Sequence, residues 1–168
     1  MADVEIKGLD ELLAKLTQLG VGIDEALEAG MKFAVEDVKG RAKILCPVDT
    51  GELRNSIQSH VRKETSGEVV GVVFSNSDHA AFVEFGTGPV GADTPVPGKY
   101  PGPLHYRETG WSYYNEKEDR WVHSKGQAAQ PFLYPALIQS IPTIPKRIAG
   151  GLHALLLRLA RKEGGGVK

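Results

Sequence analysis

The spacing of the apolar residues changes at Pro47, and this change constrains the fold more than any other feature of the chain. Before this proline, apolar residues recur every three to four positions over residues 9–19 and 24–45, which predicts two amphipathic α-helices. After it, residues 56–64 alternate between apolar and polar side chains, and residues 68–76 are rich in β-branched side chains. Both runs predict β-strands. The chain therefore combines helices with a sheet.

Further segments complete an expected α+β fold. A Thr-Ser-Gly turn at residues 65–67 predicts that the two strands form a hairpin. Residues 79–88 (HAAFVEFGTG) predict a third strand. Residues 129–141 and 146–162 predict a C-terminal helix that two prolines interrupt. We expect the N-terminal and C-terminal helices to pack on an antiparallel β-sheet.

The length favours a single domain, because 168 residues can bury one core but are too few for two comfortable ones. We expect this α+β domain to span residues 1–163, to begin with a short edge strand at residues 3–7, and to end in a disordered tail at residues 164–168. Residues 89–128 are expected to be an insertion within it. The insertion consists of a Pro/Gly-rich loop followed by a hairpin that carries both tryptophans.

The composition predicts a soluble protein made in a reducing cytoplasm. A single cysteine, Cys46, cannot form an internal disulfide, and we expect neither a signal peptide nor a membrane span. The formal net charge of −1 gives no global basic field that would attract nucleic acid. Acids are in excess over residues 1–40 and bases over residues 146–168. These ends could attract each other within one chain or between copies in an assembly.

The tripeptide Asp49-Thr50-Gly51 carries the catalytic aspartate in aspartic proteases. Such an enzyme needs two carboxylates that share a proton, which a chain of this size could supply as a dimer. However, a helix runs up to the tripeptide and Glu52 follows it. This arrangement favours a capping box, in which Asp49 accepts a bond from the backbone N–H of Glu52 and the Glu52 side chain reaches back. A dimeric aspartic protease that uses Asp49 remains the alternative.

The other reactive residue types predict no catalytic, cofactor or metal site. Cys46 lacks a base nearby in sequence and is expected to be a small buried residue at a helix end. The five histidines lack the spacing of metal ligands. The glycines of residues 86–91 precede prolines rather than a helix with a lysine, so they do not predict a phosphate loop.

The aromatic hairpin of the insertion is the candidate interface. A polar, proline-rich loop cannot easily bury this much aromatic surface by itself, and tryptophan and tyrosine are favoured at interface centres. The alternatives are a contact with another subunit or partner and a small cluster that folds back on the body. The residues concerned are Trp111, Tyr113, Tyr114 and Trp121.

Residues 47–57 (PVDTGELRNSI) resemble the signature of the head–tail joining or tail-completion (neck) proteins of long-tailed phages and prophages. This family also carries a strand like residues 81–87 (AFVEFGT) and a helix start like residues 129–136 (AQPFLYPA), in the same order. Relatives usually connect these two by a short loop, whereas this chain has the insertion. The motif residues are Pro47, Asp49, Thr50, Gly51, Leu53, Arg54, Ser56, Glu84, Gly86, Thr87, Pro131 and Phe132.

The resemblance implies a structural virion protein rather than an enzyme, without cofactors. It would act at the neck as a homo-oligomeric ring, a hexamer if it caps a tail tube, with DNA passing through the lumen unread. Its partners would be a head connector or stopper protein and the tail tube or terminator protein, after assembly in the host cytoplasm and without a membrane. A tail terminator is the alternative within this class. Glu84 has apolar neighbours, so it needs a partner if it is buried, and Arg54 could pair with Glu84 or with an acid on the next subunit.

Overall fold

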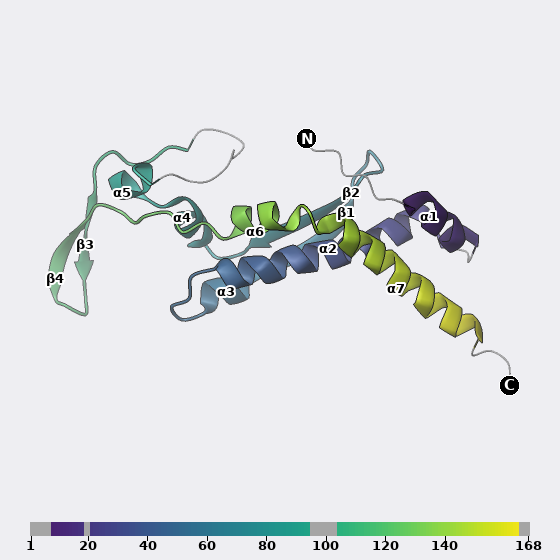
Figure 1. Cartoon of the computed structure of the whole chain (residues 1–168). Helices are drawn as coiled ribbons and strands as arrows, with labels where there is room; N and C mark the ends of the chain where they lie inside the picture. The colour runs from purple at the N-terminus through teal and green to yellow at the C-terminus, as the bar shows by residue number, and fades with distance from the viewer. Residues whose placement is uncertain (1–7, 19–20, 95–103, 165–168) are drawn as a thin grey trace. The chain divides into compact units, whose positions relative to one another are not determined.

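The structure is a computed structural model that describes residues 8–18, 21–94 and 104–164 (Figure 1). The expected strand at residues 3–7 and residues 165–168 of the expected tail lie outside the described residues, whereas Gly164, expected as the first residue of that tail, is the last residue of α7. The described elements confirm the α+β class. In chain order they are α1 (Leu9–Gln18), α2 (Ile23–Leu45), α3 (Glu52–Ser56), β1 (Ile57–Lys63), β2 (Val69–Ser75), α4 (Ala80–Phe85), α5 (Gly88–Ala92), β3 (Trp111–Asn115), β4 (Arg120–Ser124), α6 (Leu133–Ser140) and α7 (Ile144–Gly164).

The contacts between Cα atoms divide the chain into two compact units, each built from segments that are distant in sequence. Unit 1 comprises Met1–Arg41, Gln58–Phe74 and Leu137–Lys168. Unit 2 comprises Ala42–Ile57 and Ser75–Ala136. The single domain expected over residues 1–163 stays a prediction, and the two units are described separately below.

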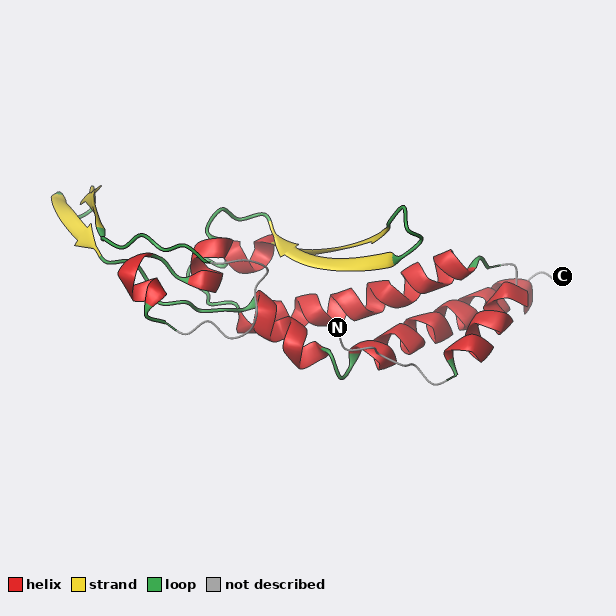
Figure 2. Ribbon diagram, turned by 90° about the horizontal axis from the view of Figure 1, so that it is seen from above, coloured by secondary structure: helices red, strands yellow, loops and turns green. Residues whose placement is uncertain are grey.

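In unit 1, α2 lies against the hairpin of β1 and β2 (Figure 2). Gly71 of β2 makes this approach possible, because a Cβ atom there would lie 2.4 Å from Cγ1 of Val35. The Ser59 hydroxyl donates to the Glu36 carboxylate at 2.5 Å, and Lys63 pairs with Asp24. β1 and β2 are neighbours in one two-stranded sheet, which confirms the hairpin predicted for these two segments.

Glycines also allow α2 to pack closely on α7. A Cβ atom at Gly30 would lie 2.9 Å from Cγ2 of Ile148, and one at Gly151 would lie 2.9 Å from the Gly30 Cα. The two helix backbones can approach each other because neither glycine has a side chain. The adjoining core contains Leu16 of α1 together with Leu152 and Leu155 of α7. The repeated apolar spacing of α1 and α7 places these leucines on the faces that pack together, and their burial stabilises unit 1.

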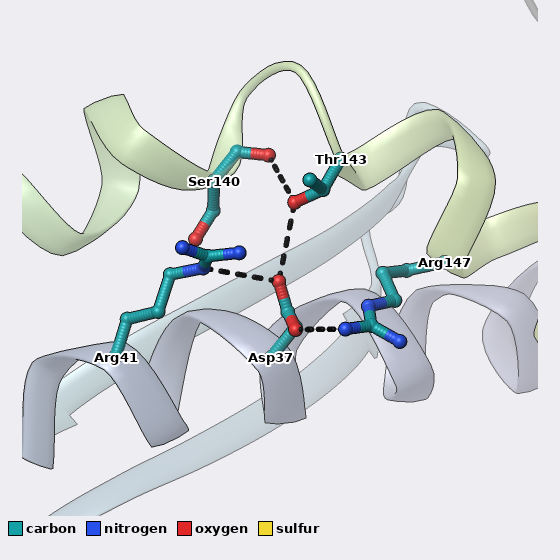
Figure 3. A network of polar contacts seen from close by, with 5 residues as sticks. All are labelled: Asp37, Arg41, Ser140, Thr143 and Arg147. Atoms are coloured by element: carbon teal, nitrogen blue, oxygen red, sulfur yellow. Dashed lines mark hydrogen bonds and ion pairs between the residues drawn. The ribbon is translucent and has the colours of Figure 1, made fainter. Parts of the chain in front are cut away.

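A polar network around Asp37 joins α2 to the turn between α6 and α7 (Figure 3). The Asp37 carboxylate accepts a bond from Arg147 Nη2 at 2.7 Å and another from Arg41 Nε at 3.3 Å, and the Thr143 hydroxyl lies 3.2 Å away. The same hydroxyl lies 2.9 Å from the backbone oxygen of Ser140. Burial acts to raise the pKa of Asp37, but the bonds from Arg41, Arg147 and Thr143 outweigh it and lower the pKa.

This network should make the free energy of unfolding depend on pH in the acid range. The pKa of Asp37 is lower in the folded state than its ordinary value of 3.8. The contribution of Asp37 to the free energy of unfolding is therefore fully present above pH 3.8 and is lost as the pH falls through the pKa of the folded state. Asp37→Asn should lower the free energy of unfolding by about 1–2 kcal/mol at neutral pH. In urea titrations the difference from wild type should shrink below pH 3.8. Exposed Asp10→Asn is the control, and an equal loss for both variants would contradict this role.

In unit 2, residues 79–88 correct a prediction, because they contain the helix α4 and the first residue of the helix α5 rather than a third strand. Ala80 and Glu84, four residues apart, are both buried, whereas Phe82 is 52% exposed. A strand would place Phe82 and Glu84 on the same face. The spacing of the buried side chains is therefore helical, and Gly86 ends α4 with φ 76° and ψ 179°, a conformation that favours glycine.

As a result, the described part of the chain contains two separate two-stranded sheets instead of one larger sheet. The second sheet is the predicted aromatic hairpin, in which β3 pairs with β4 in antiparallel fashion. Tyr113 lies opposite Val122, and Tyr114 lies opposite Trp121. Residues 116–119 form the turn between these strands.

Candidate functional site

The signature of residues 47–57 forms the turn that leads from α2 into α3 in unit 2. Gly51 precedes the helix with φ 85° and ψ −1°, a left-handed conformation that favours glycine. The Ser56 hydroxyl donates to the backbone oxygen of Leu53 at 2.7 Å and lies 2.6 Å from the Ser75 hydroxyl. The signature is thereby joined to the segment that precedes α4.

The predicted capping box is not formed. Helix α3 has Gly51 as its N-cap and no side-chain capping bond, so Glu52 is its first residue rather than its third. The backbone N–H of Glu52 donates to Thr50 Oγ1 at 3.4 Å, not to Asp49. The prediction was wrong because the left-handed glycine starts the helix two residues later than an Asp49 cap requires. Asp49 is exposed.

Cys46 has the character predicted for it. The side chain is 4% exposed, and its thiol donates to the backbone oxygen of Pro47 at 3.4 Å. Burial raises the pKa of the Cys46 thiol, the positive charge of Arg54 opposes this, and the negative charge of Glu84 adds to it. A thiol that stays protonated at neutral pH is a poor nucleophile.

Glu84 is the most strongly bonded of the motif residues. Its carboxylate is buried, with 3% of the residue exposed. The Oε2 atom accepts bonds from the backbone N–H groups of Phe132 at 2.7 Å and Leu133 at 2.9 Å, and Oε1 accepts one from Tyr134 at 2.9 Å. These donors open α6, where no intrahelical acceptor exists for them. Glu84 therefore caps α6, and the negative charge also complements the positive end of the helix dipole.

The sequence predicted that Glu84 needs a partner if it is buried, but not that the partner is a helix terminus. One feature of the sequence could have indicated that the partner of Glu84 is a helix terminus. The residues before α6, Gln130-Pro131-Phe132, include none of the Ser, Thr, Asp or Asn side chains that usually cap a helix. A helix start without a local cap needs an acceptor from elsewhere in the fold, and α4 supplies it.

Gly86, Thr87 and Gly88 form a close backbone crossing with residues 125–127. The N–H of Thr87 donates to the Gln127 oxygen at 2.9 Å, and the N–H of Gln127 donates to the Thr87 oxygen at 3.2 Å. A Cβ atom at Gly88 would lie 2.5 Å from the Lys125 oxygen, and one at Gly126 would lie 1.8 Å from the Thr87 oxygen. The insertion thus leaves the body and returns to it at the same place.

An open groove of about 1020 Å³ lies in unit 2 and is named here the motif groove. Three segments form most of its lining: residues 47–53, residues 85–88 and residues 104–107. Tyr106 holds the third segment in place by donating its hydroxyl proton to the Phe85 oxygen at 2.8 Å. Apolar side chains of the lining remain accessible, since Phe82 is 52% exposed and Leu104 is 39% exposed.

The structure gathers many of the predicted residues in this groove. The lining includes Pro47, Asp49, Thr50, Gly51, Leu53, Gly86, Thr87 and Trp111. A second set lies where Glu84 meets the start of α6, and it includes buried Phe132 directly after Pro131. Arg54 and Ser56 do not line the groove. Pairing of Arg54 with Glu84 or with another subunit stays a prediction.

The aromatic hairpin exposes most of its large side chains. Trp121 is 71% exposed, and Tyr113 and Tyr114 are each 45% exposed. The rings of Tyr114 and Trp121 meet edge to face with centroids 5.8 Å apart. A hydrogen bond to the Asp119 carboxylate raises the pKa of Tyr114. Tyr114 and Trp121 share one face of the hairpin, whereas Tyr113 lies on the other face, so both faces expose aromatic side chains.

The described residues were also compared with the side-chain arrangements that hold metal ions or cross membranes. Among the residues that the structure describes, no three His, Cys, Asp or Glu side chains are placed to hold a metal ion. The motif groove instead combines accessible apolar side chains with a few polar ones. No helix within the described ranges is long and apolar enough to cross a bilayer.

The structure also indicates where the insertion can be removed. Thr87 and Gln127 pair as in a hairpin, and Gly88 and Gly126 have φ values of 61° and 96°. Both φ values are positive, as the two central residues of a type I′ turn require. Deletion of residues 89–125, which joins Gly88 to Gly126, should therefore leave a folded protein with a cooperative thermal transition by circular dichroism.

The matched control for this deletion also removes both glycines and joins Thr87 directly to Gln127. Two residues that pair across a hairpin cannot be consecutive in the chain, so this variant should lose much of its stability. Equal stability of the two deletions would contradict the turn, and loss of cooperative unfolding in the first would show that the insertion is part of the core.

Comparison with known proteins supports a structural assignment. Residues 10–86 match the model of the HK97-gp10-like family, described as a tail component of bacteriophages. The match includes the 47–57 signature and Glu84, and it ends at Gly86, just before the insertion. Neither a curated protein nor a solved structure matches the chain significantly. Over these residues, the chain is similar to a structural component of the bacteriophage tail.

Proposed function

We propose that this chain is a structural protein of the neck of a long-tailed phage, where it acts in tail completion and head–tail joining. The family match over residues 10–86 is the observation that carries the proposal. The geometry is compatible with it, because the residues of the 47–57 signature shape a turn and line a groove. The protein would be part of the virion and would be assembled in the host cytoplasm.

In this proposal the protein forms a ring around the DNA channel, a hexamer if it caps a tail tube. A ring needs heterologous contacts, in which one surface meets a different surface of the next copy. Exposed acids in α1 and at the start of α2 include Asp10 and Glu25, and exposed bases in α7 include Arg158 and Arg161. Opposite charges on different segments suit such contacts. The lumen would pass DNA without reading its sequence.

The ring would connect a head connector or stopper protein with the tail tube or terminator protein. Electron microscopy of particles assembled without this gene tests the proposal. Separate DNA-filled heads and complete tails would support a joining role, whereas tails of abnormal length would favour a tail terminator. Intact infectious particles would contradict a neck role of either kind.

The dimeric aspartic protease remains the rival from another class, and Asp49→Ala separates the two. Because Asp49 is exposed and caps no helix, the substitution should change the free energy of unfolding by no more than about 0.5 kcal/mol. Phage particles that carry it should contain normally processed proteins. Capsids stalled with uncleaved proteins would instead favour the protease. Exposed Asp93→Ala is the matched control.

A further inference from the structure

We infer that the exposed face of α7 binds the phosphate backbone of double-stranded DNA without reading the base sequence. The inference rests on the proposed neck role, in which DNA passes through the ring, and it names the surface of the chain that would contact this DNA. The helix and the core on which it packs belong to unit 1.

The exposed face of α7 is basic. Four basic side chains of this helix are exposed: Lys146, Arg147, Arg158 and Arg161. Residues 144–161 contain no aspartate or glutamate. Arg158 and Arg161 are one turn apart, and Arg147 precedes Arg158 by about three helical turns, so these bases lie on one side of the helix. The opposite side packs into the core of unit 1 through Leu152 and Leu155.

Three of these bases are available for contacts outside the chain. Arg147 already pairs with Asp37 at 2.7 Å. Within the part of the chain that the structure describes, Lys146, Arg158 and Arg161 form no ion pair. Exposed cations without an acid beside them attract a polyanion more strongly than cations that are already paired.

The bases of α7 exceed the acids that a ring contact through α1 and α2 could offer them. Of the exposed acids in α1 and in the first turn of α2, Glu11 and Asp24 already pair with lysines of their own copy. Asp10 and Glu25 are the two that form no ion pair within the described residues. A DNA duplex, by contrast, carries one negative charge for about every 1.7 Å of its axis.

The other side chains of α7 favour the backbone of a duplex over other negatively charged partners. Single-stranded DNA is bound by stacking its bases on aromatic side chains, and α7 contains no Phe, Tyr or Trp. A membrane surface requires large apolar side chains beside the bases, and Leu157 is the only one that the described part of α7 exposes. The helix also contains no Asn or Gln to read an adenine. Lys and Arg that contact phosphates carry no sequence information.

The length of this face suits several simultaneous phosphate contacts. Lys146 and Arg161 are separated by about 22 Å along the helix axis, a length over which a duplex presents about 13 phosphate charges. Gly150 and Ala154 lie between them on the same exposed side. Because these residues are small, no long side chain holds the helix away from the backbone. We therefore expect three phosphate contacts for each copy that binds.

Fluorescence anisotropy of a labelled duplex of mixed sequence, titrated with the whole chain, tests the inference. Each phosphate contact adds about 0.9 to the steepness with which log affinity falls against log salt, so three contacts predict a slope of about −2.7. The affinity should then fall about 40-fold between about 50 mM and about 200 mM salt. Single-stranded DNA of the same length should bind more weakly, because α7 offers no aromatic side chain for stacking.

Two double variants identify the surface. Arg158→Ala/Arg161→Ala removes two of the three contacts and keeps good helix formers in α7. Its salt slope should be smaller by about two, and its affinity at low salt should fall at least about tenfold. Lys32→Ala/Lys117→Ala is the matched control, because it removes the same charge from two exposed lysines outside α7, and it should bind as wild type does. Circular dichroism checks that both variants are folded.

The other outcomes overturn the inference. Equal losses for the two double variants would show that net charge, and not the face of α7, attracts the duplex. Unchanged binding by the arginine variant would exclude α7 as the contact, and tighter binding of single-stranded DNA would exclude a duplex site. A wild type that binds no duplex at low salt would leave these bases for an acidic protein surface. All four results leave the neck role intact, which the particles assembled without this gene decide separately.

Discussion

Glu84→Ala should destabilise the protein by about 2–4 kcal/mol, because it removes the acceptor for the three N–H groups that open α6. The side chain is 3% exposed, so water cannot readily replace the lost oxygens. A hydrogen bond to a charged group in a buried site contributes more than one at the surface. Urea titration followed by circular dichroism measures the change in the free energy of unfolding.

Two further variants identify the cause of this loss. Glu84→Gln keeps one acceptor oxygen but removes the charge, so we expect a loss smaller than that of Glu84→Ala. The exposed Glu108→Gln should stay within about 0.5 kcal/mol of wild type. A loss for Glu84→Ala no greater than that of Glu108→Gln would contradict the cap.

Long periodic segments of the fold could be predicted from the sequence. The leucine spacing that predicts α1 and α7 describes their buried faces, which meet in one core through Leu16, Leu152 and Leu155. The hairpin of β1 and β2 and the aromatic hairpin follow from alternation and turn residues. In α1 and α7 the buried side chains recur with the helical spacing, so the pattern repeats often enough to identify the structure, whereas the aromatic hairpin has no buried face and its polar centre alone indicates the turn.

Short segments could not be predicted in the same way. Residues 79–88 are too short and too apolar for periodicity to separate a strand from a helix. The capping box failed because the conformation of Gly51, not the identity of Asp49, decides where α3 begins. The cap of α6 comes from a carboxylate 48 residues away from Phe132, a separation that no local pattern can reveal.

The residues of the candidate site could also be predicted only in part from the sequence. The sequence identified the 47–57 signature, Glu84 and Thr87 as a set, but it could not show which of them lie together. The structure places part of the set around the motif groove and places Glu84 under the start of α6. The sequence predicts residues 104–107 to be part of a loop, and in the structure they form a wall of that groove. The sequence pattern could not predict this wall, because it depends on tertiary contacts between the insertion and residues distant in the chain.

Gly126→Ala should destabilise the protein by about 3 kcal/mol through the backbone crossing at the base of the insertion. A Cβ atom there would lie 1.8 Å from the Thr87 oxygen, and φ is 96°, which an alanine rarely adopts. Accommodating the methyl group would separate Thr87 from Gln127 and break the two bonds between them. Thermal and urea unfolding should both record the loss.

Gly150→Ala is the matched control, because the same methyl group is added in the interior of α7, where a Cβ atom would meet nothing within 4 Å. Alanine favours a helix over glycine, so this variant should gain about 0.5–1 kcal/mol. Opposite signs for the two substitutions would show that the crossing, and not the loss of glycine flexibility in general, holds the insertion in place. A neutral Gly126→Ala would mean that the chain tolerates a wider separation of residues 86–88 from residues 125–127, and the crossing would then contribute little to the fold.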